Sequence, residues 1–175
     1  MKVPDELYVS PIVGWRVWAL RDEGDGARLA SLVQRDVWTS RRAFGASCPL
    51  RGRPLTPAGR RTPAHETAPH PLCACGIHAA AELEHALAYL GDGVLDGAAE
   101  ICGSVLGRVA LWGDVVEGQR GWRGQRAYPV ALYLPTGGLD DPYDVAFGLA
   151  DYGVPVELLD CAPTAAEVRA QLGTP

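Results

Sequence analysis

The stretch ICGSVLGRVALWGDVVEG, residues 101–118, decides the fold of this chain together with RAYPVALYLP, residues 126–135. Both stretches are rich in β-branched, aromatic and other apolar residues, which is typical of strands. The connection GQRGWRG, residues 118–124, is rich in glycine and indicates a turn between them. We therefore expect a β-hairpin in this part of the chain.

The N-terminal part of the chain predicts a second hairpin. In IVGWRVWAL, residues 12–20, successive side chains alternate between two sets, which is typical of a strand whose faces differ. RDEGDG, residues 21–26, is rich in glycine and aspartate and predicts a turn. ARLASLVQRDVW, residues 27–38, then returns as the partner strand.

Two helices are marked by their apolar spacing and their ends. From residue 77 to residue 90, apolar side chains recur every three or four positions, which predicts an amphipathic helix that Gly91 ends. Asp141 is an N-cap candidate for a second helix, and Pro142 suits its first turn. Gly153 is expected to end that helix.

The C-terminal part adds a strand and a third helix. VPVELL, residues 154–159, predicts a short strand at a sheet edge, because Pro155 has no N–H to donate to a ladder. TAAE, residues 164–167, has the spacing of a capping box that opens a short helix. We therefore predict an α+β fold: a single compact domain over residues 1–175, mainly antiparallel β-hairpins, with two or three short helices and one long loop.

Composition and charge limit the classes of protein that fit. The chain is 47% hydrophobic and 21% charged, a globular composition, and no stretch reaches the roughly 18 apolar residues of a membrane span. The N-terminus lacks the apolar run of a signal peptide, so we expect a soluble, cytoplasmic protein. Lys2 is the only lysine among 16 basic residues, which favours a GC-rich bacterial genome.

Residues 40–71 form a long segment without apolar periodicity, rich in Arg, Pro, Gly and Thr. A structureless loop of about 30 residues is uncommon inside a compact domain unless something orders it. The chain has five cysteines, which in a reducing compartment indicate metal binding, catalysis or burial rather than disulfides. Cys102 and Cys161 lie in apolar contexts and are expected to pack as small hydrophobes. We expect the others to bind a metal that orders the loop.

The cysteines nearest the loop fall in HETAPHPLCACGIHAAAELEHALAYL, residues 65–90. Cys73 and Cys75 are one residue apart, and Gly76 permits the tight backbone that this spacing requires. We expect both to stand at the N-terminus of the predicted helix, whose positive end favours thiolate over thiol. Cys48, near the start of the irregular segment, is the candidate third sulfur.

Zinc favours a tetrahedron of thiolates and imidazoles, and two histidines are candidates for the fourth position. His70 lies between two prolines, which are expected to hold it extended and too far from Cys73. We therefore favour His65, which is farther back on the loop and can fold over the cysteines. The predicted Cys3His zinc site consists of Cys48, His65, Cys73 and Cys75.

Positive charge is concentrated in the same loop. The formal net charge is −5, yet seven arginines and only one acidic residue, Asp36, lie between Arg35 and Arg61. A basic segment on an acidic protein attracts anionic partners. Aromatic residues and arginines also alternate around the turn at 118–124, and such pairs can stack on a nucleobase or bind an anion. The predicted ligand-binding residues are Trp112, Glu117, Trp122, Arg123 and Tyr128.

These patterns leave two classes of function open. In the first, four protein ligands close a structural zinc site, and the protein is a binding or regulatory module whose Arg-rich loop contacts an anionic ligand, a nucleic acid or another protein. In the second, water takes the fourth position on zinc, and the protein is a small metal-dependent hydrolase with Glu66 as the nearest general base. The sequence contains no P-loop, GxGxxG, GxSxG or HExxH motif.

If a metal orders the loop, its removal should expose the loop to protease. We expect a chelator to increase trypsin cleavage several-fold at the arginines of residues 40–71, because this polar segment cannot bury a core of its own. Arginines in the β-rich runs at 101–135 should remain protected. Limited digestion followed by mass spectrometry measures both, and equal cleavage with and without chelator would contradict the prediction.

Overall fold

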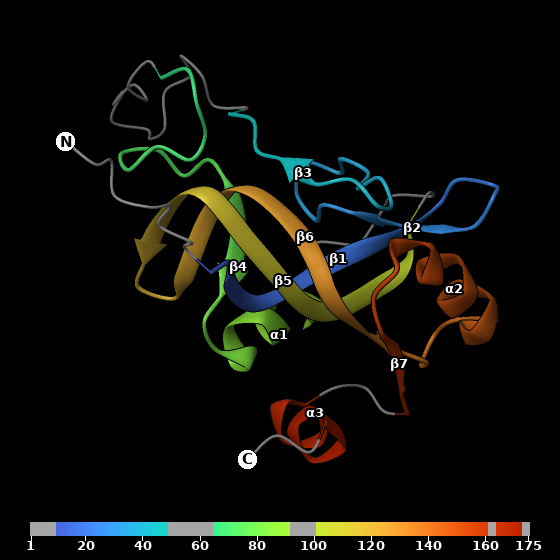
Figure 1. Cartoon of the computed structure of the whole chain (residues 1–175). Coiled ribbons are helices and arrows are strands. Elements are labelled where there is room, and N and C mark those ends of the chain that lie inside the picture. The colour runs from blue at the N-terminus through green and yellow to red at the C-terminus, as the bar shows by residue number, and fades with distance from the viewer. Residues whose placement is uncertain (1–9, 49–64, 92–100, 161–163, 173–175) are drawn as a thin grey trace.

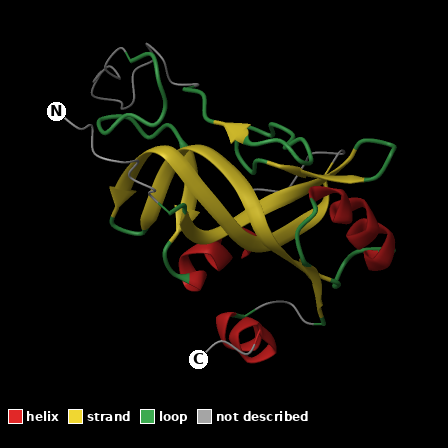
Figure 2. Ribbon diagram, viewed as in Figure 1, coloured by secondary structure: helices red, strands yellow, loops and turns green. Residues whose placement is uncertain are grey.

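The structure is a computed structural model that describes residues 10–48, 65–91, 101–160 and 164–172 (Figure 1). Within these ranges, seven strands form one mixed sheet with short helices around it, which confirms the predicted α+β class (Figure 2). None of the helices in these ranges is long and apolar enough to cross a membrane. The elements are β1 (Ile12–Asp22), β2 (Ala27–Ala30), β3 (Phe44–Gly45), β4 (Ile77–Ala80), α1 (Leu83–Gly91), β5 (Ile101–Gly118), β6 (Gly121–Pro135), α2 (Pro142–Leu149), the 3-10 helix η1 (Ala150–Tyr152), β7 (Val156–Leu159) and α3 (Ala165–Leu172).

The longest ladder joins β5 to β6, and it confirms the predicted hairpin. The two strands run antiparallel from their turn as far as Leu106 opposite Tyr133. The turn itself takes only residues 119–120, so residues 121–124, predicted as part of the connection, belong to β6. The hairpin is therefore longer than the sequence pattern indicated.

Two irregularities bend this ladder. The register shifts between Arg108 and Val109, where the partner of Val109 is Pro129, and again between Trp112 and Val115. Proline cannot donate to a ladder and is tolerated at bulges, and bulges increase the local twist of a strand. The resulting curvature of β5 and β6 is visible in Figure 1.

The curved hairpin closes four strands into a ring. β5 pairs with β1 along most of the length of β1, and β6 pairs with β4. β4 then meets β1 where Trp15 lies opposite Ala80, so the pairing returns to its starting strand. Gly14 permits this approach, because a Cβ there would lie 2.8 Å from the Cβ of Ala79. A closed ring of strands removes open sheet edges, as in a small barrel.

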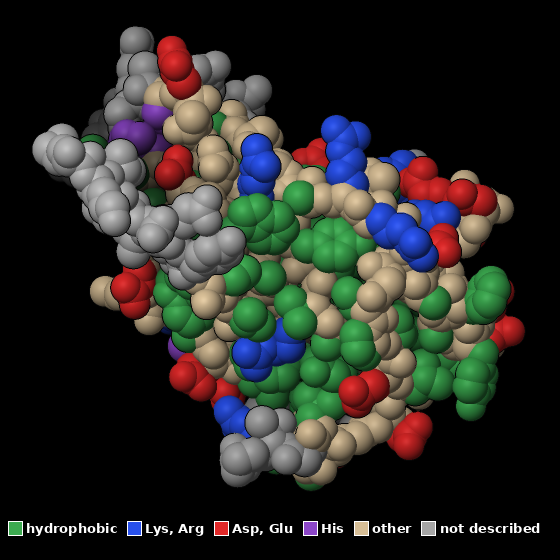
Figure 3. Space-filling view, in the orientation of Figure 1, with side chains coloured by type: hydrophobic (Ala, Val, Ile, Leu, Met, Phe, Trp, Pro, Cys, Tyr) green, Lys and Arg blue, Asp and Glu red, His purple; other side chains and the backbone are tan. Residues whose placement is uncertain are grey.

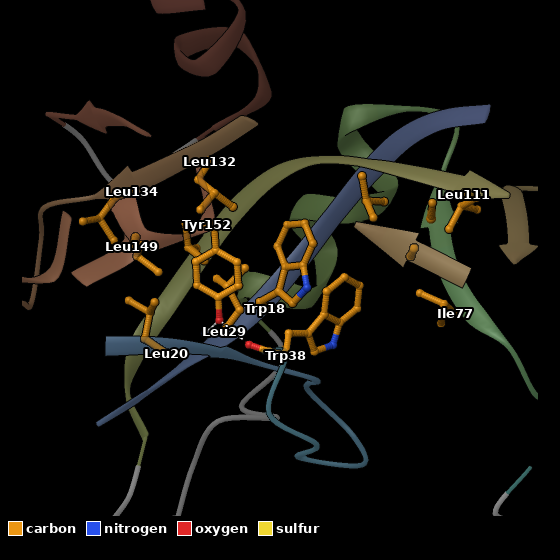
Figure 4. Packing of buried hydrophobic residues seen from close by; sticks show 14 residues of the cluster. Trp18, Leu20, Leu29, Trp38, Ile77, Leu111, Leu132, Leu134, Leu149 and Tyr152 are labelled. Carbon is orange, nitrogen blue, oxygen red and sulfur yellow. Dashed lines mark hydrogen bonds between the residues drawn. The ribbon is translucent and has the colours of Figure 1, made fainter. Parts of the chain in front are cut away.

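Residues 17–20 of β1 are buried on both faces, and their two alternating sets of side chains face two different cores. Trp18 and Leu20 belong to the larger cluster, in which Trp18 packs edge-on against Trp38 with ring centroids 5.4 Å apart (Figure 4). Val17 and Ala19 belong to the second cluster, which α1 and α3 cover. β1 is therefore the central strand between two apolar layers.

In the C-terminal part of the chain, the predicted helix ends are confirmed. The Asp141 side chain accepts hydrogen bonds from the first backbone N–H groups of α2, and Gly153 ends η1 in a left-handed conformation. Thr164 and Glu167 form the reciprocal hydrogen bonds of a capping box before α3. β7 pairs with β6 alone among the described strands, as expected of an edge strand that follows Pro155.

The helix predicted over residues 77–90 is wrong at its N-terminal end. Residues 77–80 form β4, and α1 begins only at Leu83. Along β4 the side chains alternate between buried and exposed, which is the period of a strand. The ladder that β6 offers these residues outweighs their helix-like spacing.

Two other predicted segments differ from the structure. β2 ends at Ala30 instead of residue 38, and the chain turns before Val37 bridges back to Ala30. Within the predicted irregular loop, residues 40–71, Phe44 and Gly45 form β3 against β6. Residues 49–64 of that loop lie outside the described part of the chain.

Tyr152 joins three segments through its phenol group. The Tyr152 hydroxyl accepts a hydrogen bond from the backbone N–H of Leu29 and donates one to the carbonyl of Trp38. The residue is only 2% exposed, and burial raises the pKa of Tyr152 to about 12. The protonated phenol therefore fixes η1 against β2 and the segment that follows it.

We expect Tyr152→Phe to lower the free energy of unfolding by about 1–3 kcal/mol at neutral pH, because it leaves a buried N–H and a buried carbonyl unsatisfied. Deprotonation is disfavoured in the fold, so the wild-type advantage should shrink as pH rises from about 10 towards 12. Urea denaturation at a series of pH values measures this difference. The control is Tyr143→Phe, at a residue that is 75% exposed and should show almost no change.

Candidate metal centre

The four predicted zinc ligands lie together just before β4. One potential ligand atom from each of the four side chains lies within 4.8 Å of those of the other three. Cys73 and Cys75 are buried, Cys48 is half-buried, and all three are free thiols. The residues that meet in this Cys3His cluster are Cys48, His65, Cys73 and Cys75.

Two distances in the cluster are close to those between the ligand atoms of a tetrahedral metal site. The sulfur atoms of Cys48 and Cys73 are 3.7 Å apart, and the Cys75 sulfur is 3.3 Å from Nε2 of His65. A tetrahedron with metal–sulfur bonds of about 2.3 Å and metal–nitrogen bonds of about 2.0 Å has edges of about 3.8 and 3.5 Å. A disulfide would require about 2.05 Å between the sulfurs. The four side chains are therefore close enough to bind one metal ion together.

Strand β6 holds both chain segments that carry the cysteines. Gly45 of β3 lies opposite Arg126, and Ile77 of β4 lies opposite Gly124. Cys48 follows β3 by three residues, and Cys75 precedes β4 by two. Two positions on one strand, only two residues apart, thus bring together sulfurs that are far apart in the sequence.

The backbone before β4 is a compact turn rather than the extended segment predicted from its prolines. The N–H of Cys73 donates to the carbonyl of His70 at 3.0 Å. Gly76 has a φ of +118°, and a Cβ there would lie 2.9 Å from the Cβ of Pro69. The cysteine pair also precedes a strand, not a helix, so the expected stabilisation of thiolate by a helix N-terminus is wrong.

The side chain of Arg123, on the facing strand β6, holds this turn through hydrogen bonds. Its Nη1 donates to the carbonyls of Cys73 and Cys75, the latter at 2.8 Å, and more weakly to that of His70 at 3.3 Å. Arg123 lies on β6 directly opposite His78, next to the register position that starts β4. The guanidinium therefore holds the backbone of both cysteines in place.

The thiols affect one another's ionisation. Burial disfavours the charged form of Cys73, but hydrogen bonds from Cys75 and Cys48 and the nearby charge of Arg123 outweigh it and lower the pKa of Cys73. Burial and the adjacent Cys73 raise the pKa of Cys75 to about 11. Like charges in one buried site disfavour each other, and a bound cation relieves that repulsion.

His70 also lies beside the cluster, although it is not one of the four converging side chains. Its ring stacks on that of His65 with centroids 4.7 Å apart, and its Nδ1 accepts from the N–H of Leu72. The turn brings His70 close to the cluster. The expectation that the flanking prolines hold His70 extended and away from it is therefore wrong. Within the cluster, the ring of His70 therefore packs against the side chain of His65.

The five residues predicted to bind an anionic or aromatic ligand lie in three different places. Trp112 and Tyr128 line a surface hollow with Arg41. Trp122 packs on the larger core and lies opposite Glu117 near the hairpin turn. Arg123 contacts the cysteine turn, a role that the sequence pattern did not indicate because it depends on strand register.

No protein-family model, curated protein or solved structure matches this chain. The function proposed for the cluster therefore depends on its geometry and donor atoms.

We expect Arg123→Met to weaken metal binding by about 10- to 100-fold, as is typical when the residues that support metal ligands are removed. The side chain keeps its length but loses the donors to the cysteine carbonyls. Competition with a chromophoric chelator measures the affinity. Arg126→Met, at an exposed position on the same strand, is the control, and equal affinities of the two variants would show that the guanidinium does not support the site.

Proposed function

We propose that the chain binds one zinc ion through Cys48, His65, Cys73 and Cys75, and that the ion is structural. The convergence of these four donors is the observation that carries the proposal. Three sulfurs and one imidazole nitrogen are ligands that zinc prefers, and a tetrahedron of four protein ligands leaves no position for water. The alternative, a hydrolase with an open position, requires that one of the four does not bind.

The proposed ion connects three separate segments of the chain. Cys48 follows β3, His65 begins the next described segment, and the cysteine pair leads into β4. Binding free energies of structural zinc sites are large, on the order of 10 kcal/mol, and appear as folding free energy. We infer that zinc fixes both ends of the Arg-rich segment between Cys48 and His65, whose residues 49–64 lie outside the described part of the chain.

The proposed role of this module is to bind an anionic partner. Three exposed arginines, Arg41, Arg42 and Arg126, have no carboxylate within ion-pair distance among the described residues. Exposed cations without such partners attract anions, and the effect decreases with salt. We therefore propose a small zinc-binding module that presents basic side chains to an anionic ligand.

Protein purified without added chelator should contain about one zinc ion per chain by elemental analysis. Cys73→Ser with Cys75→Ser should remove it, because two of four ligands are lost, whereas Cys102→Ala should retain it as predicted from its apolar context. His65→Ala should release zinc to a chelator faster than His70→Ala does. Full zinc content in the double serine variant would falsify the proposed site.

A further inference from the structure

A hollow of about 560 Å³ lies on the surface beside β5 and β6. Its walls come from four segments of the chain, and three of the six lining residues are aromatic. On the face shown in Figure 3, hydrophobic side chains gather below the position of β3, with Lys or Arg side chains next to them. The lining residues are Arg41, Ala43, Trp112, Tyr128, Tyr152 and Gly153.

Hydrogen bonds hold the parts of the hollow in place. The Tyr128 hydroxyl accepts from the backbone N–H of Arg41 and donates to the carbonyl of Tyr152 at 2.9 Å. Nε of Arg41 donates to the carbonyl of Asp151 at 3.2 Å. The guanidinium is thus directed along the rim by backbone groups rather than by a carboxylate.

Arg41 adopts an unusual backbone conformation at this rim. Its φ is +58°, in the left-handed region that costs a non-glycine residue about 1–2 kcal/mol. Residues held in such conformations persist where the surrounding contacts determine them, and they are frequent at binding sites. The surrounding contacts here are the bonds from Tyr128 and Asp151.

The hollow combines flat rings with unneutralised positive charge. Trp112 is partly exposed and lies opposite Arg126 in the β5–β6 register. Arg41 lines the hollow, Arg42 follows it in the chain, and Arg126 faces Trp112 across the ladder. All three are exposed, and no carboxylate among the described residues pairs with them. A ligand that fits both features has a flat aromatic ring and an anionic group, because the ring can stack while the anion meets guanidinium groups.

We propose that this hollow binds a nucleobase that carries a phosphate group, with Trp112 and Tyr128 contacting the base and Arg41 and Arg126 contacting the phosphate. The proposal rests on the proposed function, because it names the class of anionic partner and the surface that contacts it. The chain as a whole has a formal net charge of −5, so a local site is required for binding a polyanion.

The test uses the full, zinc-containing protein with fluorescein-labelled twelve-residue thymidine and uridine oligomers, followed by fluorescence anisotropy at low salt. Trp112→Leu and Arg41→Asn should each weaken binding by about tenfold or more, the range typical of losing a stacked base or a phosphate contact. Trp112→Phe, which keeps a ring, should retain most of the affinity. Asparagine tolerates a positive φ, so Arg41→Asn removes the charge and the bond from Nε to the Asp151 carbonyl but keeps the backbone conformation and the bond from its N–H to Tyr128.

Arg35→Asn provides a matched control. Arg35 also has a φ of +58° and is exposed, but it does not line the hollow. The Arg35→Asn variant should retain wild-type affinity, although it changes the net charge by the same amount as Arg41→Asn. Equal losses in the Arg35 and Arg41 variants, no dependence on the ring at residue 112, or no binding at all would each overturn the proposal.

Competition distinguishes the possible sources of the ligand. If uridine monophosphate displaces the labelled oligomer as well as an unlabelled oligomer does at equal base concentration, the ligand is a free nucleotide; otherwise it is a single strand. Tripolyphosphate, which has charge and no base, should compete poorly, and strong competition would contradict a base-binding site. Zinc is measured in every sample, so an oligomer that fails to bind a zinc-containing protein refutes the hollow and leaves the metal site standing.

Discussion

The hydrogen-bonded ladder between β5 and β6 is the interaction on which the other elements depend. β5 offers its second edge to β1, and β6 pairs with β3, β4 and β7 at successive positions. Because β3 and β4 meet β6 only two register positions apart, at Arg126 and Gly124, the cysteines that flank them converge. The ladder thus sets both the core and the position of the cluster.

The cluster combines candidate ligands that the sheet positions with one that it does not. Cys48 and Cys75 lie within three residues of strands paired to β6, and Arg123 of the same strand holds the carbonyls of the cysteine turn. His65 is the first residue of the range 65–91, and no described strand begins or ends within three residues of it. A largely prearranged set of sulfurs lowers the conformational entropy that metal binding must offset. The histidine completes a site that the sheet has already shaped.

Local patterns in the sequence predicted the elements whose signals are themselves local. The caps at Asp141 and Thr164 and the β-rich run of β5 were identified because capping groups and strand composition act within a few residues. The set of four metal-ligand candidates followed from residue type and proximity to one loop. β4 was misassigned as helix because its apolar spacing fits both periods, and only the ladder with β6 decides between them. The ring of strands and the contact of Arg123 with the cysteine turn depend on register between distant segments, which no short pattern contains.

Cys48 and His65 meet at one point although sixteen residues separate them in the chain. A chain segment pinned at both ends behaves thermodynamically as a ring, and the entropy of closing a ring grows only with the logarithm of its length, about 0.6 kcal/mol per doubling. With the proposed ion bound to both residues, we therefore expect insertions and deletions between them to cost little. In evolutionary terms, we expect this interval to change in length and sequence while the sheet and the four candidate ligands stay constant, so that specificity can diversify there and a foreign peptide can be inserted there.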